Sequence, residues 1–217
     1  MALGVFTDFL VAVGLRRKRV RKLVSREAAL AGLVEARRLL DGLGMRCWLT
    51  DGTLLGFYRE GDFLGHDKDI DLGCLIEEYK DGLVPAFAAA GWRLSHVFGR
   101  RDCGLELSFE KQGIKVDLFF FYREDGGLWH AAWRRVDKKT RNMIRYGYDA
   151  FGLREDTFLG EKFLVPDDTL KYVATKYGEG WRTPVKDWDW AFGPANARAT
   201  DVRMREGDVR DPKRAIG

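Results

Sequence analysis

Residues 48–73 read WLTDGTLLGFYREGDFLGHDKDIDLG, and this stretch decides the fold. It predicts four features in this order: a strand over 46–50, a glycine turn at 51–53, a short helix over 52–60 and a strand over 69–75. A strand that enters a helix through a tight glycine turn, with a further strand close behind, is typical of a domain that combines a sheet with helices.

Further elements are predicted on both sides of this stretch. They are a helix from Ser25, as its N-cap, to Gly44, a helix over 77–90 interrupted near Pro85, strands over 92–98, 105–110 and 114–122, and a helix over 168–177. Beyond Trp133 the pattern favours mostly helix. The sequence therefore predicts an α+β domain, with a mixed β-sheet flanked by helices and a largely helical C-terminal part.

Length and composition bound the class of protein. The 217 residues suffice for one domain with a real core, and 46% hydrophobic with 32% charged residues is an ordinary globular composition. No apolar run reaches the 18 residues of a membrane span. The three cysteines follow no zinc or disulfide spacing, so we expect a reducing compartment. We expect three parts: an apolar and basic segment over 1–24, a folded domain over 25–192, and a polar, flexible tail over 193–217.

The charge is unevenly distributed. The net charge of +4 comes from 37 basic and 33 acidic residues, but residues 16–22 alone supply six basic side chains. Without them the acidic residues outnumber the basic ones, so we expect no nucleic-acid partner. Residues 1–22, an apolar stretch followed by this basic run, either bind an anionic membrane surface or pack on the domain as a docking helix. The predicted location is cytoplasmic, peripheral at the inner face of the membrane in the first case.

Paired carboxylates mark the strand over 69–75. Asp69 and Asp71 share one face of that strand, while Ile70 and Leu72 face the core. Two carboxylates held on one face repel each other, and a divalent cation between them relieves the repulsion. Ligands that are all oxygen favour Mg²⁺ or Mn²⁺. The alternative for an isolated pair is an edge strand that uses charge to prevent aggregation.

A third carboxylate favours the metal interpretation. Asp117 lies in the apolar strand over 114–122, on the face opposite Val116 and Leu118. A charge in such a strand is costly unless it is paired or ligated. Three acids on neighbouring strands are what a metal-dependent phosphoryl-transfer site needs.

The glycine turn supplies groups for an anion. Backbone N–H groups at Gly52 and the Thr53 hydroxyl stand at the start of a helix, where phosphate binds readily, and Arg59 follows within two helical turns. On its own a Gly-Thr pair is a weak signal.

Together these features resemble a known family. Gly52-Thr53, Asp69-Ile70-Asp71 and the distant Asp117 are similar to the signature of the polymerase-β-like nucleotidyltransferase superfamily, although its usual turn is Gly-Gly or Gly-Ser with a shorter spacer. The stretch quoted above, with GLELSFEKQGIKVDLFFFY and VPDDTLKYVATKYGEGWRTPVKDWDW, resembles the LicD/fukutin family and its fukutin branch more than its choline-phosphate branch. The resemblance covers most of residues 45–192.

The resemblance implies a polymerase-β-like nucleotidyltransferase fold and a transfer reaction. Family members pass ribitol phosphate, glycerol phosphate or phosphocholine from a CDP-activated donor to a glycan or lipid-linked glycan hydroxyl, releasing CMP. Asp69 and Asp71 would then ligate Mg²⁺ or Mn²⁺, and Asp117 would ligate it or accept the proton of the acceptor hydroxyl. Substrate-binding residues would be Gly52, Thr53, Arg59, Asp67, as the first acid of the motif, and Trp181.

Other interpretations stay open at this point. Trp181, Trp188 and Trp190 could stack on a base or sugar ring, but core packing is expected for at least two of them. An alternative enzyme would add a nucleotide to a sugar, an antibiotic or an RNA end. A third possibility is an inactive glycan-binding protein, against which the retention of three clustered acids argues.

Overall fold

The computed structural model describes residues 25–65 and 67–210. The predictions for residues 1–24, including membrane contact, and for residues 211–217 of the tail lie outside the described residues. The elements in chain order are α1 (Arg26–Gly42), β1 (Cys47–Leu49), α2 (Asp51–Glu60), β2 (Ile70–Leu75), the 3-10 turn η1 (Ile76–Glu78), α3 (Leu83–Ala89), β3 (Arg93–Arg100), β4 (Cys103–Lys111), β5 (Ile114–Glu124), β6 (Gly127–Arg135), β7 (Thr140–Asp149), β8 (Leu153–Phe158), β9 (Glu161–Pro166), α4 (Thr169–Tyr177), β10 (Ala197–Arg205) and η2 (Glu206–Arg210).

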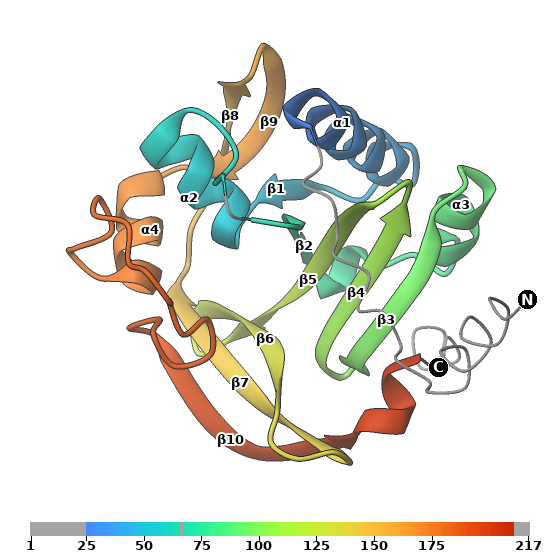
Figure 1. Ribbon diagram of the computed structural model, residues 1–217, viewed down its shortest axis with the longest axis vertical. Coiled ribbons are helices and arrows are strands. Elements are labelled where there is room, and N and C mark those ends of the chain that lie inside the picture. Colours follow the sequence, from blue (N-terminus) through green and yellow to red (C-terminus); the bar gives the residue numbers. More distant parts are fainter. Residues whose placement is uncertain (1–24, 66, 211–217) are drawn as a thin grey trace, which may run out of the picture.

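The strands form a mixed sheet, as predicted. β5 pairs with β2 in parallel and with β4 antiparallel, while β1 pairs antiparallel with β2 and parallel with β9. The C-terminal end of β5 continues into a second layer of antiparallel strands, β6, β7 and β10 (Figure 1). The strand β5 is therefore shared by both layers of strands.

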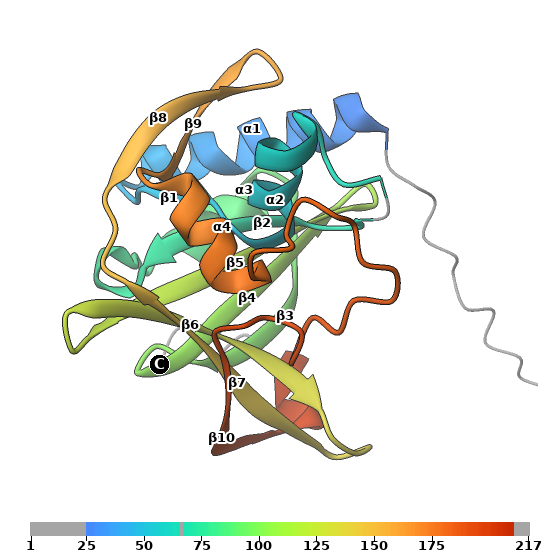
Figure 2. The same ribbon diagram turned by 90° about the vertical axis from the view of Figure 1, so that its left-hand side faces the viewer.

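Helices cover the two faces of the central strands differently. On one face α3 packs through Phe87, which stacks on Phe109 of β4 with 4.2 Å between the ring centroids. On the same face α1 lies against β5, where Gly32 of the helix meets Ile114 of the strand. The other face carries Asp71 and Asp117, and α2 begins against it. The helices α2 and α4 lie side by side there, which Figure 2 also shows.

Local signals explain the helix ends. The Ser25 side chain accepts a hydrogen bond from the Ala28 N–H and caps α1, as predicted. At the other end Gly44 adopts φ 70°, in the left-handed region that glycine enters without cost. The predicted helix over 77–90 is in fact two short pieces, η1 and α3, with Pro85 in the first turn of α3.

The predicted helical C-terminal part is wrong. Beyond Trp133 the described residues contain four strands, β7 to β10, and one α-helix, α4. The expectation of a flexible tail also fails for residues 197–205, because β10 pairs with β7 along an antiparallel ladder. β10 has few buried side chains, and its order comes from that backbone pairing rather than from an apolar face. Within the described residues, no helix has the length and apolar character to cross a membrane.

Candidate active site

The parallel pairing of β2 with β5 brings the predicted acids together. Asp71 and Asp117 occupy directly paired positions of the two strands, so their side chains share one face. Continuing the same register by one residue places Asp69 beside Lys115. The structure thus gathers Asp69, Asp71 and Asp117, as the sequence led us to expect.

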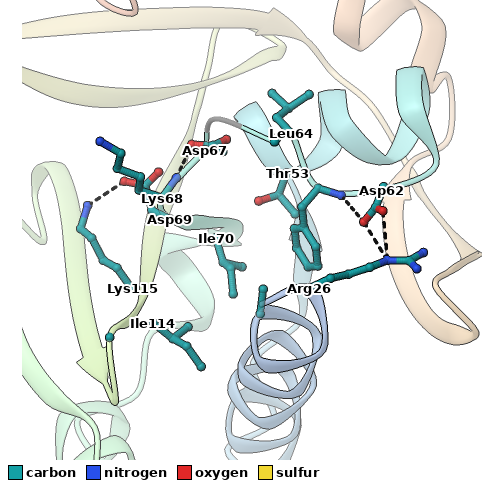
Figure 3. Close-up of a pocket in the computed structure, with 14 residues that line it drawn as sticks. Arg26, Thr53, Asp62, Leu64, Asp67, Lys68, Asp69, Ile70, Ile114 and Lys115 are labelled. Atoms are coloured by element: carbon teal, nitrogen blue, oxygen red, sulfur yellow. Dashed lines mark hydrogen bonds and ion pairs between the residues drawn. The ribbon is translucent and has the colours of Figure 1, made fainter. Parts of the chain in front are cut away.

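Lys115 connects two of these carboxylates. Its ammonium lies 3.1 Å from Asp69 Oδ2 (Figure 3) and also forms an ion pair with Asp117 Oδ2. Lys115 and Asp117 are separated by two positions on β5 and therefore point to the same side. The Lys115 side chain is 16% exposed and that of Asp117 is 6% exposed, so water screens this contact weakly.

A fourth carboxylate faces the same cluster. Glu106 of β4 is buried, and β4 pairs with β5 so that Ser108 stands opposite Asp117. Glu106 lies two positions before Ser108 on the same face. Asp117 keeps one oxygen, Oδ1, that is buried and has no partner at full hydrogen-bond geometry among the described residues, although the buried Ser108 hydroxyl opposite it acts as a donor that lowers the Asp117 pKa. A buried acceptor that is only weakly paired can accept from a further group.

Burial and mutual repulsion shift the pKa values of the acids. Burial, followed by the charges of Asp69 and Asp67, raises the pKa of Asp71 well above its usual value. Burial and Asp69 raise the pKa of Asp67 to about 7. Burial also raises the pKa of Asp117, against the opposing effect of Lys115. The cluster holds more negative charge than its one ammonium balances.

The glycine turn holds Asp71 in place. The Gly52 N–H at the start of α2 donates to Asp71 Oδ2 at 2.8 Å, and the Thr53 hydroxyl accepts from the Asp71 N–H at 2.8 Å. The Asp71 carboxylate thereby caps an orphan donor at a positive helix end. A side chain at position 52 would collide with Asp67 Oδ2 and lie 3.1 Å from Asp71 Oδ2, so it would displace the Asp67 carboxylate and crowd that of Asp71. That these groups also bind phosphate stays a prediction.

Behind the turn lies a buried ion pair. Asp51, with φ 45°, forms an ion pair with Lys176 of α4, and both side chains are almost fully buried. His130 Nε2 of β6 lies 3.7 Å from Asp51 Oδ1. Burial alone would raise the pKa of Asp51, but Lys176 and His130 outweigh it and lower that pKa. Burial lowers the pKa of His130 to about 4, so the imidazole is neutral at pH 7.

The remaining predicted residues are Arg59 on α2 and the tryptophans that follow α4. Arg59 contacts the Glu60 carboxylate at 2.7 Å and donates to the Trp181 carbonyl at 3.3 Å, which links α2 to the segment after α4. Trp181 is buried against Tyr58, Trp188 is half-buried and Trp190 is exposed. Core packing is thus clearest for Trp181, and phosphate or substrate contact by Arg59 and Trp181 stays a prediction.

A cavity of about 250 Å³ opens next to the acids. Its lining includes Asp67, Asp69 and Lys115 on one side and Ile70 and Ile114 on another. Figure 3 shows Lys115 and Asp69 pointing toward each other at its edge. The cavity offers both charged and apolar walls to a ligand beside the carboxylates.

The donor set fits a hard divalent cation, although its atoms are not gathered around one point. Carboxylate oxygens, the buried Asp117 Oδ1 among them, are suitable ligands for Mg²⁺ or Mn²⁺. Among the described residues, no three His, Cys, Asp or Glu side chains already form a ligand cluster. Lys115 stands between Asp69 and Asp117, where its single positive charge partly offsets their charges.

Comparison with known proteins gives the family. Residues 44–168 match the model described as LicD/FKTN/FKRP, nucleotidyltransferase domain. The chain belongs to the LicD/FKTN/FKRP family. The matched region contains the glycine turn, the three acids and Lys115, and its description agrees with the predicted nucleotidyltransferase fold.

Relatives in this family include named transferases. The human "Ribitol-5-phosphate transferase FKTN" is 38% identical over 184 residues, which cover 84% of this chain and 39% of that protein. The human "Ribitol 5-phosphate transferase FKRP" is 31% identical over 148 residues, covering 65% of this chain and 29% of that protein. The chain therefore spans less than half the length of these LicD/FKTN/FKRP relatives.

Three residues that this LicD/FKTN/FKRP domain brings to the site were not predicted from the sequence. Lys115 had a readable signal, since it precedes Asp117 by two positions in a predicted strand. Glu106 stands in the apolar run LELSF, where an acid is as unusual as Asp117 is in its own strand. Asp51 adjoins the glycine turn, but its partner Lys176 is 125 positions away, and no local pattern connects them.

Proposed function

We propose that this chain carries the catalytic domain of a phosphotransferase. It moves a phospho-alcohol, with ribitol phosphate expected first, from a CDP-activated donor to a hydroxyl of a glycan or lipid-linked glycan and releases CMP. The observation that carries the proposal is the meeting of Asp69, Asp71 and Asp117 on one face of β2 and β5, beside the helix start at Gly52. The names of the FKTN and FKRP relatives support ribitol phosphate as the group transferred.

The reaction needs positioning and charge compensation more than covalent chemistry. The acceptor hydroxyl oxygen bonds to the phosphorus that bears the alcohol, and the bond from that phosphorus to the CMP oxygen breaks. CMP leaves with the electron pair, and the hydroxyl proton passes to a base. Mg²⁺ or Mn²⁺ bound at this site would neutralise the diphosphate and make CMP a better leaving group.

The chain's own residues would bind the metal and hold its ligands in position. Asp69, Asp71 and Asp117 would hold the metal, with Asp117 offering its buried Oδ1, which has no hydrogen bond of full geometry. Gly52 and Thr53 fix Asp71 on the sheet, and a side chain at position 52 would displace the Asp67 carboxylate. Rigid support of this kind is what phosphoryl transfer requires, because misplacement of a ligand by 1 Å costs about 10²-fold in rate.

The test compares donors. Radiolabelled CDP-ribitol, CDP-glycerol, CDP-choline and CTP are incubated with the protein, a glycan acceptor and Mg²⁺ or Mn²⁺, and transfer and CMP release are measured. We expect label transfer from one CDP-alcohol, loss of transfer with EDTA and no transfer by Asp117→Asn. Incorporation of nucleotide from CTP without transfer of a phospho-alcohol would instead favour a nucleotidyltransferase.

Donor binding gives a readout that needs no acceptor. A donor present at 100 times its dissociation constant stabilises the folded protein by about 2.7 kcal/mol, which thermal unfolding detects. Stabilisation by none of the CDP-alcohols, with or without metal, would contradict the proposed donor class.

A further inference from the structure

Lys115 occupies an unusual position for a lysine. Its ammonium contacts Asp69 and Asp117, two of the three acids to which the proposed function assigns a divalent cation. Register explains the position, since Asp117 lies two residues on along β5, and Asp69 directly precedes β2, where continuing the register by one residue places it beside Lys115. The hairpin turn at Gln112 and Gly113, both with positive φ, sets the pairing of β5 with β4.

One ammonium cannot satisfy this cluster. Asp71 makes no ion pair with Lys115, Asp117 Oδ1 has no hydrogen bond of full geometry, and the buried Glu106 adds a further carboxyl. A divalent ion carries twice the charge and takes six or more oxygen ligands, so it would satisfy groups that Lys115 leaves without a partner. An ammonium and a divalent ion so close together would also repel each other.

The cavity beside the acids gives the Lys115 side chain space for a second position. Its side chain lines the cavity of about 250 Å³ that opens beside Asp67 and Asp69. A lysine ammonium sits on a flexible four-carbon stem, and its compact charge binds phosphate well. A diphosphate held at a metal on these acids would bring its oxygens to the side of the cluster on which Lys115 stands.

We propose that Lys115 is an exchangeable counter-ion of the active site. In the metal-free protein its ammonium bridges Asp69 and Asp117. When the divalent cation binds, the ammonium leaves the carboxylates and contacts the diphosphate of the donor. The inference rests on the proposed function for its metal and its diphosphate, and it assigns one residue to two successive tasks.

The proposal predicts opposite effects of one substitution on two ligands. Lys115→Met is expected to bind Mn²⁺ at least tenfold more tightly than wild type, by electron paramagnetic resonance titration, because no ammonium competes. The same variant, saturated with Mn²⁺, is expected to bind CDP-ribitol at least tenfold more weakly. Lys115→Arg keeps a cation and should lie closer to wild type in both measurements. A lysine with a merely structural role would weaken both ligands or neither.

A matched control lies on the neighbouring strand. Lys111 of β4 forms an ion pair with Glu35 at 2.7 Å, and Glu35 belongs to α1 rather than to the acid cluster. Lys111→Met removes a strand lysine and its ion pair in the same way, so it should leave Mn²⁺ and donor affinities unchanged.

A measurement on the wild-type protein avoids dependence on the folding of a variant. Acetic anhydride labels free lysines, and mass spectrometry reports the extent at each one. We expect labelling of Lys115 to rise severalfold when Mg²⁺ is added and to fall again with Mg²⁺ and CDP-ribitol together, while Lys111 stays constant. Labelling of Lys115 that is unaffected by Mg²⁺ would overturn the proposal.

The outcomes separate this inference from the proposed function. Equal Mn²⁺ affinity of wild type and Lys115→Met would reject the counter-ion role of Lys115 and leave the proposed metal site unaffected. Absence of Mn²⁺ binding in both proteins would reject both the counter-ion role of Lys115 and the proposed metal dependence. Tighter Mn²⁺ binding by Lys115→Met, with no phospho-alcohol transfer by wild type, would support metal exchange and reject the proposed reaction.

Discussion

The ion pair between Asp51 and Lys176 is expected to be a large single contribution to stability. Lys176→Met removes the ammonium and keeps a flexible side chain of similar length. Both charged side chains are almost out of water, 13% exposed for Asp51 and 6% for Lys176. The substitution therefore leaves a buried carboxylate without its main partner.

The size of the loss follows from this burial. Removing one partner of a buried ion pair costs about 3–5 kcal/mol, whereas an exposed pair contributes about 0–1 kcal/mol. For a domain of this length each kcal/mol lowers the melting temperature by about 2–4 °C, so Lys176→Met should lower it by about 6–20 °C. Lys162→Met is the control, because its ion pair with Glu155 is more than half exposed on both sides.

The loss should depend on pH in a defined direction. Lys176 and His130 hold the pKa of Asp51 below its usual value, so the pair stabilises wild type at neutral pH and loses this contribution as pH falls through that pKa. In the variant, burial without Lys176 raises the pKa of Asp51, and the folded state takes up a proton more readily. The difference between variant and wild type is therefore largest near pH 8 and shrinks below about pH 5.

Urea unfolding at pH 8 and at about pH 4, near the pKa of an unperturbed aspartate, measures this difference directly. Asp51→Asn combined with Lys176→Met should recover part of the loss, because no buried charge is left behind. A Lys176→Met variant that loses no more free energy of unfolding than Lys162→Met at pH 8 would refute the reasoning. A loss that is equal at both pH values would show that the Asp51 charge is not its cause.

Three further predictions concern the acids and the glycine turn. Asp71→Asn should abolish transfer. The metal-free variant should be as stable as wild type or more stable in thermal unfolding, because the substitution relieves repulsion between carboxylates while the amide oxygen still accepts from the Gly52 N–H. A large fall in melting temperature would contradict this. Because the pKa of Asp67 is raised to about 7, the free energy of unfolding of metal-free wild type should fall as pH rises from about 4 to 7. In Asp67→Asn the free energy of unfolding should depend less on pH over this range. Gly52→Ala should cost about 1–3 kcal/mol in urea unfolding and abolish transfer, because its methyl group meets Asp67. Gly42→Ala, where nothing lies within 4 Å, should be neutral or stabilising, and equal losses at both positions would refute the steric argument.

The central strands could be predicted because their patterns are local. Alternation of acids with Ile70 and Leu72 identifies β2, and an apolar strand interrupted by Asp117 identifies β5. The strand–turn–helix unit over β1 and α2 likewise follows from the short sequence around Gly52. Each of these predictions needs only neighbours within about ten residues.

The C-terminal strands were missed because their patterns are weak. In β6 six consecutive residues are buried, so no polar alternation marks it as a strand, and β10 has mostly exposed side chains. These strands are defined by pairing with one another, which no local window contains. The hairpin of β8 and β9 turns at Leu159 and Gly160, both with positive φ, but leucine is not a residue typical of such a turn, so the sequence marks it only through Gly160.

The site depends on one further quantity that the sequence does not provide, the register between β2 and β5. With Asp71 opposite Asp117, acids and Lys115 share a face, and Asp69 falls beside Lys115. A shift of one residue would set Asp71 beside Val116 or Leu118, turn the acids of one strand toward the opposite face and leave Lys115 without Asp69. The apolar faces under α1 and α3 exclude that shift, because it would bury carboxylates against Phe109 and its neighbours. The same packing that builds the core therefore fixes which charges meet in the site.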